Sequence, residues 1–484
     1  MAGIKYGAYG ELRESVVEEI TQAETAAVYI GTAPVNLVRG WTDAAAVNSP
    51  VNVKSMADAY GKVGYSDNWN AFTLCEPLNV HFGQTGKNIG PIYLINVLNP
   101  AKHKKEQATT KSVIFVDGKA EFVSETIVLD TLAIEGKKEN VDYTLDYSFS
   151  RHAVLLTSVG STPIDGTVEV TFDEVDPAKV TAEDIIGDET DKGVYTGAAC
   201  IKLVFPKFAV VPSMIAAPGW SDQPEVHKAL LQYSYQINGH WYAMLYPDIP
   251  LTAATIQEAI KWKTDNHYDS EYEKPYWPQV KDSYGKIYHL STLAVAEQMR
   301  VDQSHDGVPA ETNGNKEINA VAQYFGENSL NQGFDQEKAN TLTESGVSTA
   351  IPWGGRWVLW GDHTGAYVED KQIDARGIFD VNIRMLMFLL NNFQQRWAPK
   401  IDVNMDRAMK DTIINVEQER LDAYAASGYL LGSPQIVFLA AENSTAQLMN
   451  GQFVYTAQVT PTPPMKGLTC GVAYTSAGFD AYFK

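Results

Sequence analysis

The stretch MIAAPGWSDQPEVHKALLQYSY, residues 214–235, holds residue types that can perform nucleophilic catalysis. Ser221, Asp222 and His227 lie within seven residues of one another, directly after an apolar run that ends in Pro-Gly. The piece Gly-Trp-Ser-Asp matches the first positions of a hydrolase nucleophile elbow, but the next residue is Gln223, where that turn needs a glycine. A hydrolase is therefore one function to weigh.

The same residues also describe the start of a helix. Asp222 as N-cap with Glu225 three residues later forms a capping box, and Pro224 suits the first turn. Ser221 and His227 would lie about 9 Å apart along such a helix, at roughly 1.5 Å per residue, and far apart in rotation. They could not form the hydrogen bond of a catalytic pair, so the helix interpretation is favoured. One apolar face follows from the spacing of Val226, Ala229, Leu230 and Tyr233.

Other candidate sites for catalysis, metals or cofactors are weaker. Asp362 and His363 could act as acid and base, but neighbours in an extended strand point to opposite faces. The piece FGQTGKN fails as a phosphate loop because Asn88 stands where Ser or Thr should bind magnesium. No two of the nine histidines lie closer than thirteen residues apart, and Asp302 and Asp306 lack the spacing of a calcium loop. We expect no cofactor and no metal.

Composition narrows the class of protein. The chain of 484 residues exceeds what one core usually serves, so two or three domains are expected. Its 38 basic and 59 acidic residues give a net charge of -21, which disfavours nucleic acid and anionic membrane surfaces as partners. Cys75, Cys200 and Cys470 are isolated thiols, typical of a reducing compartment. Without a signal-peptide pattern or a long apolar run, a soluble protein made in the cytoplasm is expected.

The order of patterns predicts an α+β multidomain fold. Residues 1–20 form an arm, and strands alternate with helices over 21–105 and 193–342, which indicates an α/β central domain. Between them, 106–192 carries short alternating runs, such as YTLDYSF and GTVEVTF, that predict a β-sandwich on the outer surface. Its charge is 7 basic minus 19 acidic residues, or -12. Residues 343–484 form a last domain with two long helices followed by strands.

The chain ends offer strands that could pair within the subunit or with a neighbour. The piece GLTCGVAYTS alternates, with Leu468, Cys470, Val472 and Tyr474 on one face. The preceding piece QFVYTAQVT does the same with Phe453, Tyr455, Ala457 and Val459. A hairpin that closes its own domain and a strand exchanged with another subunit both fit this spacing.

Several motifs occur in the order found in one family. The start YGAYGELRESVVEEITQAETAAVYIGTAP gives an arm and then a strand ending in Gly, and VVPSMIAAPGW gives an apolar strand ending in Ala-Pro-Gly. The run KANTLTESGVSTAIPWGGRWVLWGDHT is the most specific, and AASGYLLG ends the second long helix. Over nearly its whole length, the chain resembles the sheath proteins of contractile phage tails and related contractile injection systems.

The resemblance implies a non-enzymatic subunit that forms stacked hexameric rings around a tail tube and contracts to drive the tube through the host envelope. It implies a subtilisin-like central domain without catalytic residues, an immunoglobulin-like insertion, and a C-terminal sheath core domain. Baseplate and tail terminator proteins would be further partners, without direct nucleic-acid contact or membrane insertion. Such a subunit would be assembled in the host bacterial cytoplasm and reside in the virion tail.

The residues expected to carry this function pair strands, form hinges or contact the tube, and none is catalytic. Strand exchange would use Ile4, Tyr6 and Ala8 of the arm together with Leu468, Cys470, Val472 and Tyr474, with hinges at Gly10 and Gly467. Lys400, Arg407 and Lys410 could meet an acidic tube surface or form a solvated helix face. The alternatives are a hydrolase with a cleft site near Ser221 or His363, and a static capsid or shell protein.

Overall fold

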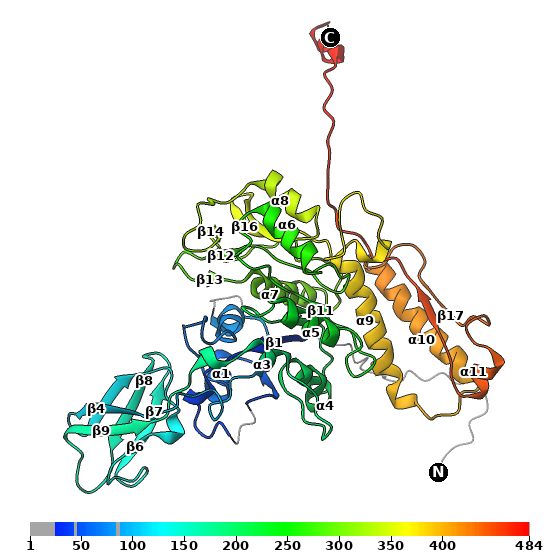
Figure 1. Ribbon diagram of the computed structural model, residues 1–484. Coiled ribbons are helices and arrows are strands. Elements are labelled where there is room, and N and C mark those ends of the chain that lie inside the picture. Colours follow the sequence, from blue (N-terminus) through cyan, green and yellow to red (C-terminus); the bar gives the residue numbers. More distant parts are fainter. Residues whose placement is uncertain (1–24, 43–45, 84–87, 484) are drawn as a thin grey trace, which may run out of the picture.

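The computed structural model describes residues 25–42, 46–83 and 88–483 (Figure 1). Four predicted arm positions, Ile4, Tyr6, Ala8 and Gly10, lie outside the described residues. The chain is a mixed α/β, multidomain structure with several small sheets, each packed into a hydrophobic core of its own or shared with a neighbour. None of the described helices is both long and apolar enough to cross a bilayer.

The largest sheet of the described chain has five strands in the order β11-β10-β1-β3-β2. Only β2 runs antiparallel to its neighbour. Every residue of β1, β10 and β3 is buried, as expected for parallel strands covered on both faces. The strands are β1 (Ala27–Gly31), β2 (Pro50–Val53), β3 (Ile92–Asn96), β10 (Met214–Ala216) and β11 (Met244–Leu245).

Short helices surround this sheet. Helix α7 (Leu290–Gln303) packs on β10, and α5 (Pro224–Ser234) packs on β11. Eleven of the residues of α7 are buried, so this helix runs through the core rather than over it. The others are α1 (Met56–Lys62), α2 (Cys75–Leu78), α3 (Ala182–Ile186) and α4 (Val204–Phe208).

The inserted β unit lies at one end of the molecule and has its own core (Figure 1). It contains two antiparallel three-stranded sheets, β4-β9-β6 and β5-β8-β7. The Asn36 amide fixes it to the central unit by donating to the carbonyl of Ile127 at 2.8 Å, and Tyr60 stacks on Phe149. The strands are β4 (Thr109–Phe115), β5 (Lys119–Val123), β6 (Ala133–Ile134), β7 (Tyr143–Ser148), β8 (Ala153–Ser158) and β9 (Gly166–Phe172).

A third core gathers around buried Trp277, which stacks on Phe334 and meets Phe325 edge-on. The hairpin of β15 (Thr349–Trp353) and β16 (Arg356–Trp360) contributes to this core and contacts α8 (Gln336–Thr343). The expected boundary at 342/343 falls at the end of α8. The remaining elements are α6 (Ile256–Asp265), β12 (Gln279–Lys281), β13 (Ile287–Tyr288) and β14 (Ala322–Tyr324).

Two long helices, α9 (Asp380–Trp397) and α10 (Arg407–Ala426), lie side by side and share a fourth core with a two-stranded sheet (Figure 1). Asp406 caps α10 by accepting from the Met409 amide at 2.7 Å. Gly428, with φ +78°, ends it in the left-handed conformation that glycine adopts without strain. The sheet pairs β17 (Gln435–Val437) with β18 (Thr456–Gln458), and α11 (Thr445–Met449) lies between them in sequence.

Residues 463–475 form an extended strap that leaves the body and carries the C-terminus far from it (Figure 1). The sequence predicts a strand here, but the strap makes no backbone–backbone hydrogen bond with any other described residue. A strand needs a partner for its N–H and C=O groups, and the described residues of this chain offer none along the strap. A short 3-10 helix (Ser476–Phe483) follows.

Candidate assembly site

Ser221 is fully buried and takes part in a structural contact. Its Oγ accepts from the Asp248 amide at 3.1 Å, and its carbonyl accepts from the Tyr268 hydroxyl at 2.7 Å. His227 instead contacts Glu273 and stacks on Tyr268, with ring centroids 3.6 Å apart. Ser221 and His227 therefore form no nucleophile–base pair, as the geometry of a helix start predicts.

The predicted capping box at Asp222 is wrong. Helix α5 begins at Pro224, its N-cap is Gln223, and no side chain caps it. Proline is favoured at the first helical position because its fixed φ suits the helix and its missing N–H has no partner there anyway. This preference places the start one residue later than the Asp222–Glu225 spacing suggests.

The side chains of Asp362 and His363 also make structural contacts within the fold. The His363 Nδ1–H donates to the carbonyl of Thr343 at 2.9 Å, and its ring lies against Tyr367. Burial lowers the pKa of His363, so the ring is neutral at neutral pH. Buried Asp362 pairs with Lys466 Nζ at 2.5 Å, 104 residues away in sequence.

Carboxylates around His289 favour the charged form of its imidazole ring. Its backbone amide and its Nδ1 lie 2.8 and 2.7 Å from the two carboxylate oxygens of Glu76. Burial by itself would lower the pKa of His289, but Glu76, Asp248 and Asp222 raise it to about 9. Burial raises the pKa of Asp248, which accepts from Ser291, to about 6.

We expect the His289–Glu76 pair to make stability depend on pH. Because folding raises the pKa of His289 from 6.5 to about 9, its contribution is complete below pH 6.5 and is lost as the pH rises to 9. Denaturant titrations should show the free energy of unfolding falling across this window. His289→Gln should flatten that fall, whereas His267→Asn, at an exposed position, should leave it unchanged. Equal slopes in wild type and His289→Gln would contradict this assignment.

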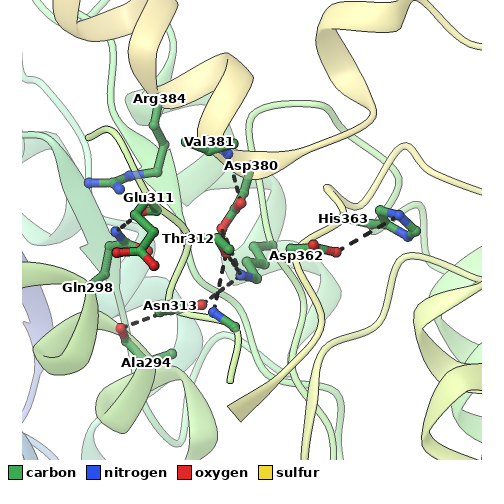
Figure 2. A network of polar contacts seen from close by, with 12 residues as sticks. Ala294, Gln298, Glu311, Thr312, Asn313, Asp362, His363, Asp380, Val381 and Arg384 are labelled. Atoms are coloured by element: carbon green, nitrogen blue, oxygen red, sulfur yellow. Dashed lines mark hydrogen bonds and ion pairs between the residues drawn. The ribbon is translucent and has the colours of Figure 1, made fainter. Parts of the chain in front are cut away.

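A buried polar network joins α9 to the central unit (Figure 2). Lys274 and Asp380 are completely buried and lie 2.7 Å apart, Nζ to Oδ2. Lys274 also donates to Asn313 Oδ1 at 2.7 Å, and Asp380 Oδ1 accepts from the Val381 amide at 2.7 Å. Burial lowers the pKa of Lys274, and the Asp380 carboxylate opposes this.

A second buried ion pair connects α9 with α7. Arg384 Nη1 donates to Asp302 Oδ1 at 3.0 Å, and its Nη2 contacts the other carboxylate oxygen. Gln298 of α7 donates to the same carboxylate at 2.8 Å. Burial alone would lower the pKa of Arg384, but Asp302 raises it. With the Lys274–Asp380 pair, this contact makes α9 a rigid extension of the central unit.

The strap displays the residues predicted for strand exchange. Leu468, Val472 and Tyr474 are 83%, 93% and 84% exposed, and Cys470 is exposed as well. Gly467 has open space around it, with no atom within 4 Å of where a side chain would begin. Exposed apolar side chains that gather on one short segment, as here, mark a surface for interaction with a partner.

Contacts of Thr462 and Lys466 hold the base of the strap. The Thr462 amide donates to the carbonyl of Tyr429 at 3.1 Å, its hydroxyl donates to the carbonyl of Gly428 at 2.7 Å, and Lys466 pairs with buried Asp362. The free part of the strap therefore begins at Gly467. Sequence spacing could not reveal the Lys466–Asp362 pair, because the two residues belong to elements far apart in the chain.

We expect Lys466→Met to destabilise the subunit by about 1–3 kcal/mol, because it leaves the buried Asp362 carboxylate without its cation. Lys466→Arg keeps a cation and should retain most of the stability. Chemical denaturation of both variants measures the difference. If Lys466→Met were as stable as Lys466→Arg, the pair would not anchor the strap.

Comparison with known proteins shows which proteins this chain is similar to. No family model matches the chain. A tail sheath protein of Burkholderia phage BcepMu is 25% identical over 468 residues, which cover 92% of this chain and 91% of that protein. The chain is therefore similar to a tail sheath protein over nearly its whole length. The resemblance inferred from the sequence motifs is confirmed, and the relatives are structural sheath proteins rather than enzymes.

Solved sheath structures share the fold of this chain. The helical sheath of the anti-feeding prophage in its contracted state matches with a TM-score of 0.56 at 11% identity, over 97% of this chain and 98% of that chain. A chain of the six-fold symmetrised anti-feeding prophage baseplate matches with a TM-score of 0.55 at 11% identity, over 98% of this chain and 100% of that chain.

The three cations predicted to meet a tube lie near the start of α10. Lys400 is exposed, and Arg407 projects into solvent. Lys410 pairs with Asp411 at 2.7 Å. The segment 400–411 carries three acidic residues beside these three basic ones, so its net charge is zero. A contact between this segment and a tube stays a prediction.

Proposed function

We propose that this chain is the structural subunit of a contractile tail sheath, polymerising as stacked hexameric rings around a tail tube and contracting to drive the tube through the host envelope. The phage relative and the sheath and baseplate neighbours support this function. The six-fold symmetry of the baseplate neighbour supports rings of six. The single observation that carries the proposal is the exposed apolar strap.

Another subunit would give the strap the contacts that it lacks within the described residues. Burying Leu468, Val472 and Tyr474 would each contribute about 1.5–3 kcal/mol, and pairing would satisfy the backbone groups of residues 463–475. Extended, these residues reach roughly 40 Å, at about 3.3 Å per residue. In the proposed assembly, the strap and the N-terminal arm complete sheets on neighbouring subunits.

Strand exchange explains how subunits could move and stay joined. Backbone hydrogen bonds fix the pairing of an exchanged strand, whereas the linker next to it remains free to change its angle. Contraction would then carry rigid bodies from a metastable extended state to a state that buries more surface, in a heterologous helical assembly. The buried ion pairs of Lys274 and Arg384 keep α9 and the central unit together as one such body.

The finer description of the subunit belongs to the same proposal. The central unit would be subtilisin-like and the β unit over 106–192 immunoglobulin-like, on the outer surface, with the sheath core domain over 343–484. The tail tube, baseplate and tail terminator proteins would be its partners. Assembly would take place in the host bacterial cytoplasm, and the finished sheath would belong to the virion tail.

Electron microscopy of the purified protein tests this function. A sheath subunit should give tubes, and a population of shorter, wider tubes should mark the contracted state. Closed shells would favour a static shell protein instead. Tubes in which the axial spacing between rings takes a single value would do the same. Loss of a hydrolytic activity in Ser221→Ala would favour the hydrolase, whereas we expect no activity to lose.

Deletion of residues 1–12 should leave a folded monomer that does not polymerise, because those residues would complete a neighbour's sheet. Gel filtration with light scattering measures the mass, and circular dichroism checks the fold. A variant with Gly inserted after Gly10 lengthens the hinge without removing the arm and should still assemble. Ordered sheaths from the truncated protein would show that the arm has no role in assembly.

A further inference from the structure

The dipeptide Asn-Gly occurs three times in the chain, at 238–239, 313–314 and 450–451. Glycine has no Cβ, so its backbone nitrogen is unhindered and can attack the carboxamide carbon of the asparagine before it. The attack requires contact with water, a carboxamide that is free to turn, and a backbone that can leave its folded conformation. The structure meets these requirements very differently at the three sites.

Asn313 meets none of them. Its side chain is completely buried. Its Nδ2 donates to the Tyr276 hydroxyl at 3.1 Å and to the carbonyl of Ala294 at 3.0 Å, and its Oδ1 accepts from Lys274 at 2.7 Å. Closure of a ring on this carboxamide would break all of these bonds, so Asn313 should stay intact while the subunit is folded.

Asn238 is exposed but firmly held in a tight turn. Its Nδ2 donates to the carbonyl of Lys202 at 3.0 Å, and the amide of the following glycine donates to the carbonyl of Gln236 at 2.7 Å. Ile237 and Trp241, on either side of the turn, are buried. The turn therefore opens only when apolar side chains are exposed to water, which makes such opening rare.

Asn450 is exposed and ends helix α11 as its C-cap. Its carboxamide makes no hydrogen bond with another described residue. The Gly451 amide donates to the carbonyl of Leu448, and the Gln452 amide donates to that of Gln447, both at 3.0 Å, which is a Schellman motif. No residue of α11 is buried, so this helix end opens at little cost and releases the Gly451 nitrogen.

We infer that Asn450 is a site of spontaneous modification, which the folded subunit converts into aspartate and isoaspartate. Hydroxide takes the proton of the Gly451 amide, and the nitrogen then forms a bond to Cγ of Asn450. The bond from Cγ to Nδ2 breaks, and Nδ2 takes up a proton from water and leaves as ammonia. Water then opens the succinimide ring at either of its two carbonyls. The inference does not depend on the proposed sheath function.

Both products should loosen the helix end at which they form. The new carboxylate lies at the C-terminus of α11, where the backbone carbonyls already carry partial negative charge. The isoaspartate product also adds a methylene to the main chain between Asn450 and Gly451, so the two bonds of the Schellman motif no longer fit. Modified subunits should therefore be more acidic and less ordered between β17 and β18.

Peptide mass spectrometry of the purified full-length protein, stored in mildly alkaline buffer, measures conversion at each site. Fragmentation that separates aspartate from isoaspartate identifies the products. Asn450 should be converted at least about fivefold faster than Asn238, the factor that one further hydrogen bond of ordinary net strength gives, and Asn313 should not react. An intact Asn450, or conversion of Asn238 at the same rate or faster, would overturn the inference.

Variants test the chemistry and the opening of α11 separately. Asn450→Gln should remove the reaction at this position, because the longer side chain closes a ring much more slowly, whereas Asn238→Gln should leave conversion of Asn450 unchanged. Ser444 starts α11 with a capping box, in which its amide donates to Gln447 Oε1 at 2.9 Å.

Ser444→Ala removes this cap and should raise the rate at Asn450 about fivefold, in keeping with the usual effect of losing an N-cap. The rate at Asn238 in the same sample is the internal control and should not change. An unchanged rate at Asn450 in Ser444→Ala would overturn the assignment of the reaction to an opened α11.

Discussion

Removal of residues 467–484 should give a folded monomer that forms no sheath. Of this segment, the side chains of Leu468, Val472 and Tyr474 project into solvent, and the strap up to Thr475 makes no backbone–backbone hydrogen bond with other described residues. Its loss should therefore change the free energy of unfolding by no more than about 0.5 kcal/mol, as for surface substitutions. Lys466 and its pair with Asp362 remain in the truncated chain.

Light scattering would measure the loss of assembly, and denaturant unfolding would measure the unchanged stability. A matched pair of variants separates the two faces of the strap. Serine at Leu468, Val472 and Tyr474 should abolish or strongly weaken assembly, whereas serine at Thr469, Ala473 and Thr475 should weaken it less. Polymerisation by the truncated chain would show that the strap is not a joint between subunits.

Asp380→Asn or Lys274→Met should each lower the free energy of unfolding by about 3–5 kcal/mol. Both residues are fully buried, and removal of either leaves an uncompensated charge where water cannot reach it. Thr312 and Asn313 also bond to this pair, so the loop between α7 and β14 should loosen together with the start of α9. Chemical denaturation followed by tryptophan fluorescence measures the loss.

The double variant Lys274→Met with Asp380→Leu is the control, because replacing both charges by apolar side chains leaves none unpaired. It should be more stable than either single variant. Single variants within 1 kcal/mol of wild type would mean that this pair does not hold α9 to the central unit. Sheath assembly by the single variants would further report whether a rigid α9 is required for polymerisation.

Local patterns in the sequence predicted individual strands of the β unit. The runs YTLDYSF and GTVEVTF correspond to β7 and β9, because alternation with one buried face is a property of each strand alone. The N-cap of α5 is Gln223 and not the predicted Asp222, since both positions satisfy local rules and only the folded backbone chooses between them.

Contacts distant in sequence could not be predicted. Lys274 and Asp380 lie 106 residues apart, and nothing near either residue marks the other. The alternation of Leu468, Cys470, Val472 and Tyr474 predicted a strand but left its partner open. The structure shows that no described part of the subunit provides that partner. This depends on the tertiary placement of the other strands, which local sequence patterns do not give. Likewise, the hydrogen bond from the Ile436 amide of β17 to Gln418 requires α10 to lie beside this strand.

A density map of the assembled sheath, at a resolution that traces the chain ends, tests the central claim most directly. The account predicts that the strap from Gly467 onward lies as an added strand on another subunit, in the extended and in the contracted state. Chain ends that fold back on their own subunit, with no neighbour engaged in any assembled particle, would contradict it.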